Sequence, residues 1–416
     1  MSVDEKRAFA LMEKLGFERV SGSEAEARAA RMLCEEAASF GVTCALEPFE
    51  VEDGEVTKAE LEVLSPYRQV YPVTGYLRSD STPPEGMEAD FAYVEDGLPA
   101  NLTDVRGKAV LVNRRPGYRV YEALKGAGAG AVITFSGDYQ DDPGRTDHGQ
   151  WKLRPMLTEA FGGTVAVNLR CADAMDMVRR GARRVRLVVE SKKITRTSHN
   201  VCAVLPGSEK PEEEIVFGAH YDSVFFSRGM YDNGAGSVSI MELMRHFAAH
   251  PPRRTLRFCW FGSEEQGLLG AKAYTAQHDL KNVRLMFNLD VGGPVLGRNC
   301  AFVTGEKSAV AYVDGVLKEA GYAFETRQSI QSSDSVPFAD RDVPAINLFR
   351  GAAAGAGEMH TRRDDGAFLS PEGLGAILHP ALLLAEKMVN GAVIPVETTV
   401  PAEMHEEIDK YLFRKK

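Results

Sequence analysis

Cysteine, positive charge and long apolar runs are all scarce in this sequence. Its six cysteines are scattered over 416 residues without a CxxC pair, so we expect reduced, mostly structural thiols. Lys and Arg total 49 against 59 Asp and Glu, a net charge of −10, which excludes a general nucleic-acid binder. The apolar runs are too short to cross a bilayer, so we expect no membrane partner either.

The first residues also do not have the pattern of a secretory signal. The opening MSVDEKRAFALM carries charges where such a signal needs its apolar stretch, and we therefore expect a cytoplasmic protein. What is present is 44% hydrophobic and 26% charged residues, the composition of a globular protein with ample core. The length suggests two domains, or a large one carrying an insertion.

The first half of the chain contains two regions with different sequence patterns. Helical spacing over about 4–42 predicts two packed helices, with Ser23 as an N-cap. From about 56 to 191, short strand-like runs are separated by Gly, Pro and acidic clusters, with two helical stretches between them. This predicts a β-rich module, with a polar loop at 137–150.

From about residue 200, apolar strands alternate with amphipathic helices. The expected strands are 215–219, 256–262, 285–290 and 345–349, and the expected helices are 234–249, 266–277, 309–320 and 373–389. Such alternation predicts a parallel sheet covered by helices on both faces. Ligands bind at the carboxyl ends of the strands in such sheets, so chemistry is expected just after each run.

Acidic residues and histidines occupy these positions. Taken singly, each has an ordinary explanation: Asp232 can cap a helix, Glu264 and Glu265 can form an acidic first turn, and Asp290 can belong to a turn. Their coincidence at the ends of strands or loops is what favours a site. Five candidate metal ligands share this placement: His220, Asp232, Glu265, Asp290 and His360.

Two imidazoles and three carboxylates suit a pair of divalent ions of the zinc type. Two ions about 3.5–4 Å apart need a shared carboxylate, and Asp232 is the natural bridge. One ion is then expected to take His220 and Asp290, and the other Glu265 and His360.

Two further carboxylates complete the predicted site. Asp222 can accept the second N–H of the His220 imidazole and fix its tautomer. Glu264 is free to take a proton from the metal-bound water and pass it to a leaving amine. Together these roles describe a peptidase mechanism.

At this point the residues resemble a known family. The segments concerned are GAHYDS (218–223), DNGAGS (232–237) followed by Glu242, GSEEQGLLGA (262–271), NLDVGG (288–293) and HTRRD (360–364). In order and spacing they resemble the motifs of the co-catalytic zinc aminopeptidase and glutamate carboxypeptidase family. The resemblance implies the same residue roles and an α/β catalytic domain with a doubly wound, mixed, mostly parallel sheet and helices on both faces.

The same resemblance implies a domain organisation. Residues 1–55 and 192–416 would form the metallopeptidase domain, and residues 56–191 would be a β-rich protease-associated insert. GKAVLVNR and GAGAGAVITFS are the parts of the insert most similar to that module. The insert would shape access to the site without supplying catalytic groups.

Two positions depart from the family pattern. Some carboxypeptidase-type members have Tyr before the second His ligand, where this chain has Met359. A segment near the substrate pocket often has His after an Asp, whereas here Ser335 follows Asp334. We expect Asp334 to cap the short helix that follows, with a substrate contact as the alternative.

The leading expectation is a di-zinc aminopeptidase of short peptides, with homo-oligomerisation left open. A carboxypeptidase of the glutamate carboxypeptidase type is the alternative, and it would need a cationic pocket. The candidate residues for that pocket are Arg327, Arg341, Arg350 and Arg362. Glutaminyl cyclase and a non-catalytic module like the transferrin-receptor ectodomains are disfavoured, because all five ligand positions and Glu264 are present.

Overall fold

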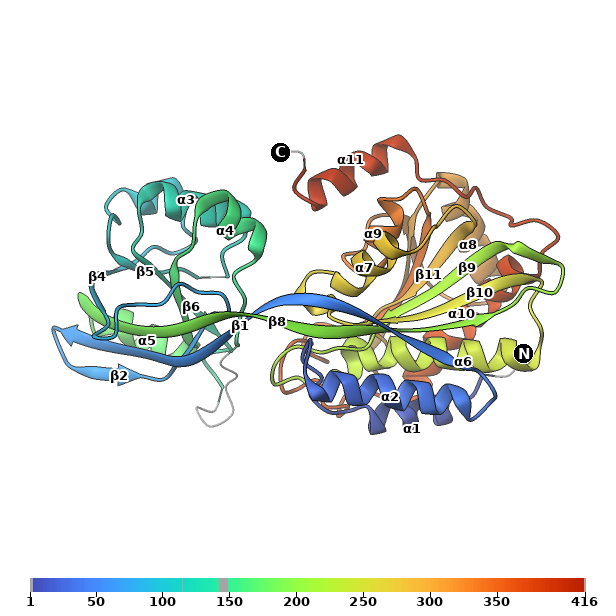
Figure 1. Cartoon of the computed structure of the whole chain (residues 1–416), viewed down its shortest axis with the longest axis horizontal. Coiled ribbons are helices and arrows are strands. Elements are labelled where there is room, and N and C mark those ends of the chain that lie inside the picture. The colour runs from blue at the N-terminus through green and yellow to red at the C-terminus, as the bar shows by residue number, and fades with distance from the viewer. Residues whose placement is uncertain (1–2, 114, 142–148, 415–416) are drawn as a thin grey trace. The chain divides into compact units, whose positions relative to one another are not determined.

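The chain folds into two compact units. A computed structural model describes residues 3–113, 115–141 and 149–414, so residues 142–148 of the loop expected at 137–150 lie outside the described residues. One unit comprises Met1–Val51 and Thr197–Lys416, and the other comprises Glu52–Arg196. We call them the catalytic unit and the inserted unit. Two strands, β1 (Cys44–Ser65) and β8 (Arg184–Leu205), carry the chain from one unit into the other (Figure 1).

A seven-stranded sheet forms the centre of the catalytic unit. Its order is β13-β12-β14-β11-β9-β10-β8. The four central strands are parallel: β14 (Ala345–Ala352), β11 (Val283–Leu289), β9 (Lys210–His220) and β10 (Arg254–Phe261). Antiparallel pairing adds β8 on one side and β12 (Gly297–Thr304), with its parallel neighbour β13 (Glu325–Gln328), on the other. The expected mostly parallel sheet is confirmed.

Helices cover both faces of this sheet (Figure 1). One face carries α1 (Glu5–Lys14), α2 (Glu24–Ala38), α6 (Ala235–Ala249), α8 (Lys307–Glu319) and α10 (Pro371–Asn390); the other carries α7 (Leu269–Gln277), α9 (Ser335–Ala339) and α11 (Ala402–Tyr411). Ser23 caps α2 as predicted, with its side chain accepting from the Glu26 N–H. No described helix is long and apolar enough to serve as a membrane span.

Burial on both faces explains the continuous apolar runs of the strands. In β9, Phe217 points into the core under α6 and α10, while its neighbour Val216 points into the core under α7. Phe258 and Phe261 divide in the same way on β10. Because both faces are dry, the polar side chains of these segments collect where the strands end.

The inserted unit has its own helices, and its strands follow β8 in the strand order. Its strands are β4 (Met87–Tyr93), β5 (Ala109–Leu111), β6 (Ala131–Ser136) and β7 (Val165–Arg170), all parallel, with β3 (Val73–Gly75) antiparallel at the edge and β2 (Gln69–Tyr71) paired with β1. They follow β8 in the order β4-β5-β6-β7-β3, with β4 antiparallel to β8. Its helices are α3 (Tyr118–Ala127), α4 (Pro155–Phe161) and α5 (Cys171–Arg179), with a 3-10 turn at Pro99–Leu102. The sequence indicated α3 and α5 but not α4, which is a short helix of seven residues.

Strand lengths were predicted less well than strand positions. β9, expected over 215–219, spans Lys210–His220, and β1 and β8 are each 22 residues long. Residues 184–205 contain no Gly or Pro that would end β8 early.

The sheet centre sets a stability prediction. Phe217 is fully buried between Phe258 and Phe287, with ring centroids 5.0 and 5.1 Å away. Phe217→Ala should lower the free energy of unfolding of the catalytic unit by about 3–5 kcal/mol, because it leaves a cavity. Urea denaturation followed by the fluorescence of buried Trp260 measures this. As a control, Phe413→Ala changes an exposed side chain and should alter the free energy of unfolding by less than about 0.5 kcal/mol. An equally small change for Phe217→Ala would contradict the described packing.

Candidate metal centre

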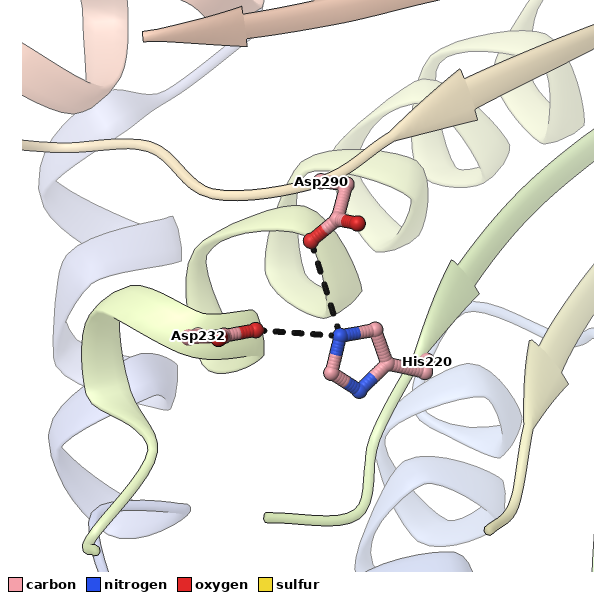
Figure 2. Close-up of side chains that lie close together, drawn as sticks. All are labelled: His220, Asp232 and Asp290. Atoms are coloured by element: carbon pink, nitrogen blue, oxygen red, sulfur yellow. Dashed lines mark ion pairs between the residues drawn. The ribbon is translucent and has the colours of Figure 1, made fainter. Parts of the chain in front are cut away.

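His220 is the last residue of β9 and lies in a cluster of carboxylates (Figure 2). Its Nε2 atom is 3.1 Å from Asp232 Oδ1 and 3.5 Å from Asp290 Oδ1. Asp290 directly follows β11, and Asp232 lies in the segment that leads into α6. All three residues are buried, so the parallel strands bring them together at one edge of the sheet.

A second group of donors shares Asp232. The Nε2 atom of His360 lies 2.9 Å from Asp232 Oδ2 and 3.2 Å from Glu265 Oε2. Within each group, one possible ligand atom per residue lies within 4.8 Å of the others. The two oxygens of Asp232 therefore face different imidazoles, and the five predicted ligand residues form two sets joined at this one carboxylate.

Asn233 holds the loops of Asp232 and Asp290 against each other. Its Oδ1 atom accepts from the Val291 N–H at 3.1 Å and its Nδ2 donates to the Leu289 carbonyl at 2.9 Å. The start of α6 comes so close that a Cβ atom on Gly236 would lie 2.1 Å from the Leu289 carbonyl oxygen. Glycine is required there because no side chain fits.

Asp222 connects His220 to the loop after β10. Its carboxylate is fully buried and accepts from the backbone N–H groups of Glu264 at 3.0 Å and Glu265 at 3.2 Å. Asp222 Oδ1 also lies 3.3 Å from Nδ1 of His220. One carboxylate thus fixes the backbone of both glutamates, a contact that the sequence did not predict, and lies close enough to the imidazole for the predicted orienting role.

Glu264 lies beside the donor groups with its Oε2 atom 4.0 Å from His220 Nε2. Burial raises the pKa of its carboxyl well above the usual range. Burial, together with the charge of Asp232, also raises the pKa of Glu265 to about 7. For His360, burial lowers the pKa, but Asp232 and Glu265 outweigh it and raise the pKa to about 11. The acidic cluster therefore attracts positive charge strongly.

The donor set fits divalent cations. Its imidazole nitrogens and carboxylate oxygens are the atom types that bind zinc-like ions. Two buried oxygens, Glu265 Oε1 and Asp290 Oδ1, have no hydrogen-bond partner among the described residues. Buried carboxylate oxygens are normally satisfied, and bound cations would satisfy these.

Two acidic residues behave differently from what the sequence suggested. Asp364 received no role, yet its carboxylate is buried and accepts from the N–H groups of Tyr231 at 2.7 Å and Asp232 at 3.0 Å. The sequence signal that could have indicated this role is the position of Asp364, four residues after His360 and inside the HTRRD motif. Asp364 ties the His360 loop to the backbone of Asp232.

The expected helix cap at Asp334 is wrong. Asp334 precedes α9 but its side chain makes no capping hydrogen bond. Its backbone is already helical, at φ −56° and ψ −18°, whereas a capping side chain needs the extended geometry that lets it reach back to the first N–H groups. The carboxyl is fully buried, and burial raises its pKa well above the usual range.

Comparison with known proteins agrees with this geometry. Residues 200–385, which contain all seven predicted site residues, match the family model Peptidase family M28. The chain is 26% identical to aminopeptidase YwaD of Bacillus subtilis over 358 residues, covering 80% of this chain and 72% of that protein. It is 27% identical to human carboxypeptidase Q over 322 residues, covering 72% of this chain and 66% of that protein.

The fold is also found among solved structures. A structure described as a zinc aminopeptidase from Bacillus subtilis superposes with a TM-score of 0.79 at 21% identity, covering 96% of this chain and 98% of that one. The residues matched by the family model include the strand ends where the donor groups lie. The resemblance seen in the sequence motifs is confirmed, because residues 200–385 match peptidase family M28, and the chain is a metallopeptidase.

Proposed function

We propose that this protein is a di-zinc aminopeptidase that removes the N-terminal residue of short peptides. The observation that carries the proposal is the pair of donor groups sharing Asp232, with the buried Glu264 carboxyl beside them. The names of similar proteins, an aminopeptidase and a zinc aminopeptidase, support the choice of metal and of substrate end. The inserted unit, residues 52–196, is proposed to be a protease-associated domain, and it contains none of the seven site residues.

Each residue has a distinct part in the proposed reaction. His220 and Asp290 would hold one ion, Glu265 and His360 the other, and Asp232 both. Ions bound there would polarise the scissile carbonyl and activate the attacking water. Glu264 would accept a proton from the attacking water and deliver it to the leaving amine. Asp222 keeps the His220 ring and the Glu264 backbone in place.

Metal removal tests the centre directly. A chelator should abolish peptidase activity and zinc should restore it, because the proposed residues alone supply no strong nucleophile. Asp232→Ala should lose both ions, since it removes the shared ligand, whereas His220→Ala should chiefly weaken one. Elemental analysis of the dialysed variants measures the two cases, with exposed Asp365→Asn as the control. Two ions retained at full affinity by Asp232→Ala would refute the bridge.

Glu264 is separable from its neighbour Glu265 by the matched change to Gln. Glu264→Gln keeps size and polarity but removes the proton acceptor, so kcat should fall about 10²–10⁴-fold while metal content stays unchanged. Glu265→Gln should instead weaken metal binding. Steady-state kinetics and metal analysis on the same samples measure both. If the two variants gave the opposite pattern, the roles of the two glutamates would have to be exchanged.

Carboxypeptidase activity is the second candidate, supported by the similarity to carboxypeptidase Q. A carboxypeptidase needs a cation for the substrate's terminal carboxylate. Arg350 donates to two backbone carbonyls, and Arg327 lies over an aromatic ring. Arg341 is exposed and lies two residues after the end of α9. Arg362, two residues after His360, is the candidate closest in sequence to the site.

The two activities differ in the peptide end that they require. Dipeptides with a free amine should be cleaved, and the same dipeptides with an N-acetyl group should be cleaved at least about 10²-fold less efficiently, because a blocked amine loses its charge and its hydrogen bonds. Amidation of the C-terminus should change kcat/KM much less. Chromatographic product analysis on the four matched dipeptides measures this. The reverse order of sensitivity would favour a carboxypeptidase and point to Arg362.

A further inference from the structure

Two ionisable side chains from the N-terminal segment are buried beneath the loops that carry the site. Arg19 and Glu26 are each 1% exposed. They lie seven residues apart in the chain, about 200 residues before the site residues. Burying a charge is costly unless it is compensated, so each requires a structural reason.

Arg19 donates to backbone carbonyls at both ends of the loop after β9. Its Nε donates to the Tyr221 carbonyl at 2.6 Å, next to His220. At the other end of the loop, Nη1 donates to the Arg228 carbonyl at 2.6 Å and Nη2 to the Gly229 carbonyl at 2.9 Å, three residues before Asp232. Nη1 also donates to two carbonyls of the N-terminal segment itself, at residues 15 and 17.

The backbone of Arg19 is tied to the same loop. Its N–H donates to the Ser223 hydroxyl at 2.9 Å, and its carbonyl accepts from the Ser223 N–H at 3.1 Å. Burial lowers the pKa of Arg19 to about 10, while Asp222, Asp364 and Asp232 favour its charged form. The guanidinium therefore remains a cation beneath an acidic cluster and holds the loop that runs from one proposed ligand to the next.

Glu26 holds the other loop, the one that follows β10. Its Oε1 atom accepts from the Ser263 N–H at 3.0 Å and from the Ser198 hydroxyl at 2.9 Å. Its Oε2 atom accepts from the Gly22 N–H at 2.7 Å. Ser263 has a left-handed backbone, at φ +55°, and directly precedes Glu264. The Glu26 carboxylate thus stabilises the turn from which both glutamates of the site project.

We propose that Arg19 and Glu26 are positioning residues that fix the two site loops from beneath and thereby set the geometry of the donor groups. This inference rests on the proposed metal centre. Neither side chain is assigned contact with substrate or metal. Both act through the backbone on which His220, Asp232, Glu264 and Glu265 are placed.

Conservative variants separate positioning from folding. Arg19→Lys keeps the charge but has three donors instead of five, so it cannot span both ends of the loop. Glu26→Gln is isosteric, but its amide NH₂ must face the N–H of either Ser263 or Gly22. Ser223→Ala removes one hydroxyl from the Arg19 contact and is expected to fold. The matched controls are Arg28→Lys and Glu24→Gln, which change exposed residues of α2.

Cobalt(II) serves as the probe, because its visible absorption reports ligand geometry. All variants are first compared by circular dichroism and thermal midpoint. We expect folded Arg19→Lys and Glu26→Gln to bind Co²⁺ about 10–100-fold more weakly than wild type, with altered visible spectra. We expect kcat to fall by a similar factor while KM changes less than about threefold. Ser223→Ala should show a smaller shift in the same direction, and the two controls should match wild type.

Two results would overturn the inference in distinguishable ways. If wild type and the folded variants shared one Co²⁺ affinity, spectrum and kcat, the buried pair would have no positioning role, and the proposed function would stand. If wild type itself bound no Co²⁺, the metal centre would be rejected and the inference with it.

Discussion

The shared carboxylate of Asp232 is the contact on which the proposed centre depends. Its two oxygens face two imidazoles that are far apart in the sequence. Nε2 of His220 lies 3.1 Å from one oxygen, and Nε2 of His360 lies 2.9 Å from the other. A single side chain can join two groups only if its own backbone is held still. Asp364 and Asn233 provide this, because Asp364 accepts the N–H of Asp232 and Asn233 crosslinks the adjacent loops.

Two layers of the surrounding structure hold the donor groups in position. The parallel strands deliver the donors to one edge of the sheet, which is where open α/β sheets form sites. A second layer of buried polar side chains then holds the loops after the strands: Asp222 from within the site, and Arg19 and Glu26 from the N-terminal segment. The layer is polar because loop backbones at a strand end leave N–H and carbonyl groups that must be satisfied.

The similar proteins include one named as an aminopeptidase and one named as a carboxypeptidase. Hydrolysis of a peptide bond makes the same demands in both cases, so the donor set does not distinguish them. Discrimination lies in the charged peptide end that the pocket recognises, and it is decided by residues outside the donor groups. Met359 and Arg362, on either side of His360, are therefore the positions of interest for specificity.

The sequence by itself determined the mostly parallel sheet, the helices on both faces and the family resemblance, because apolar periodicity and short motifs are local signals. It also indicated the candidate donor residues, which lie at the ends of strands or in the loops that follow them. Only the tertiary structure decided that Asp364 supports Asp232, that Asp334 does not cap its helix, and that Arg19 and Glu26 lie beneath the loops. These contacts join residues far apart in the chain, and a lone Arg, Glu or Asp in a sequence carries no sign of what it is buried against.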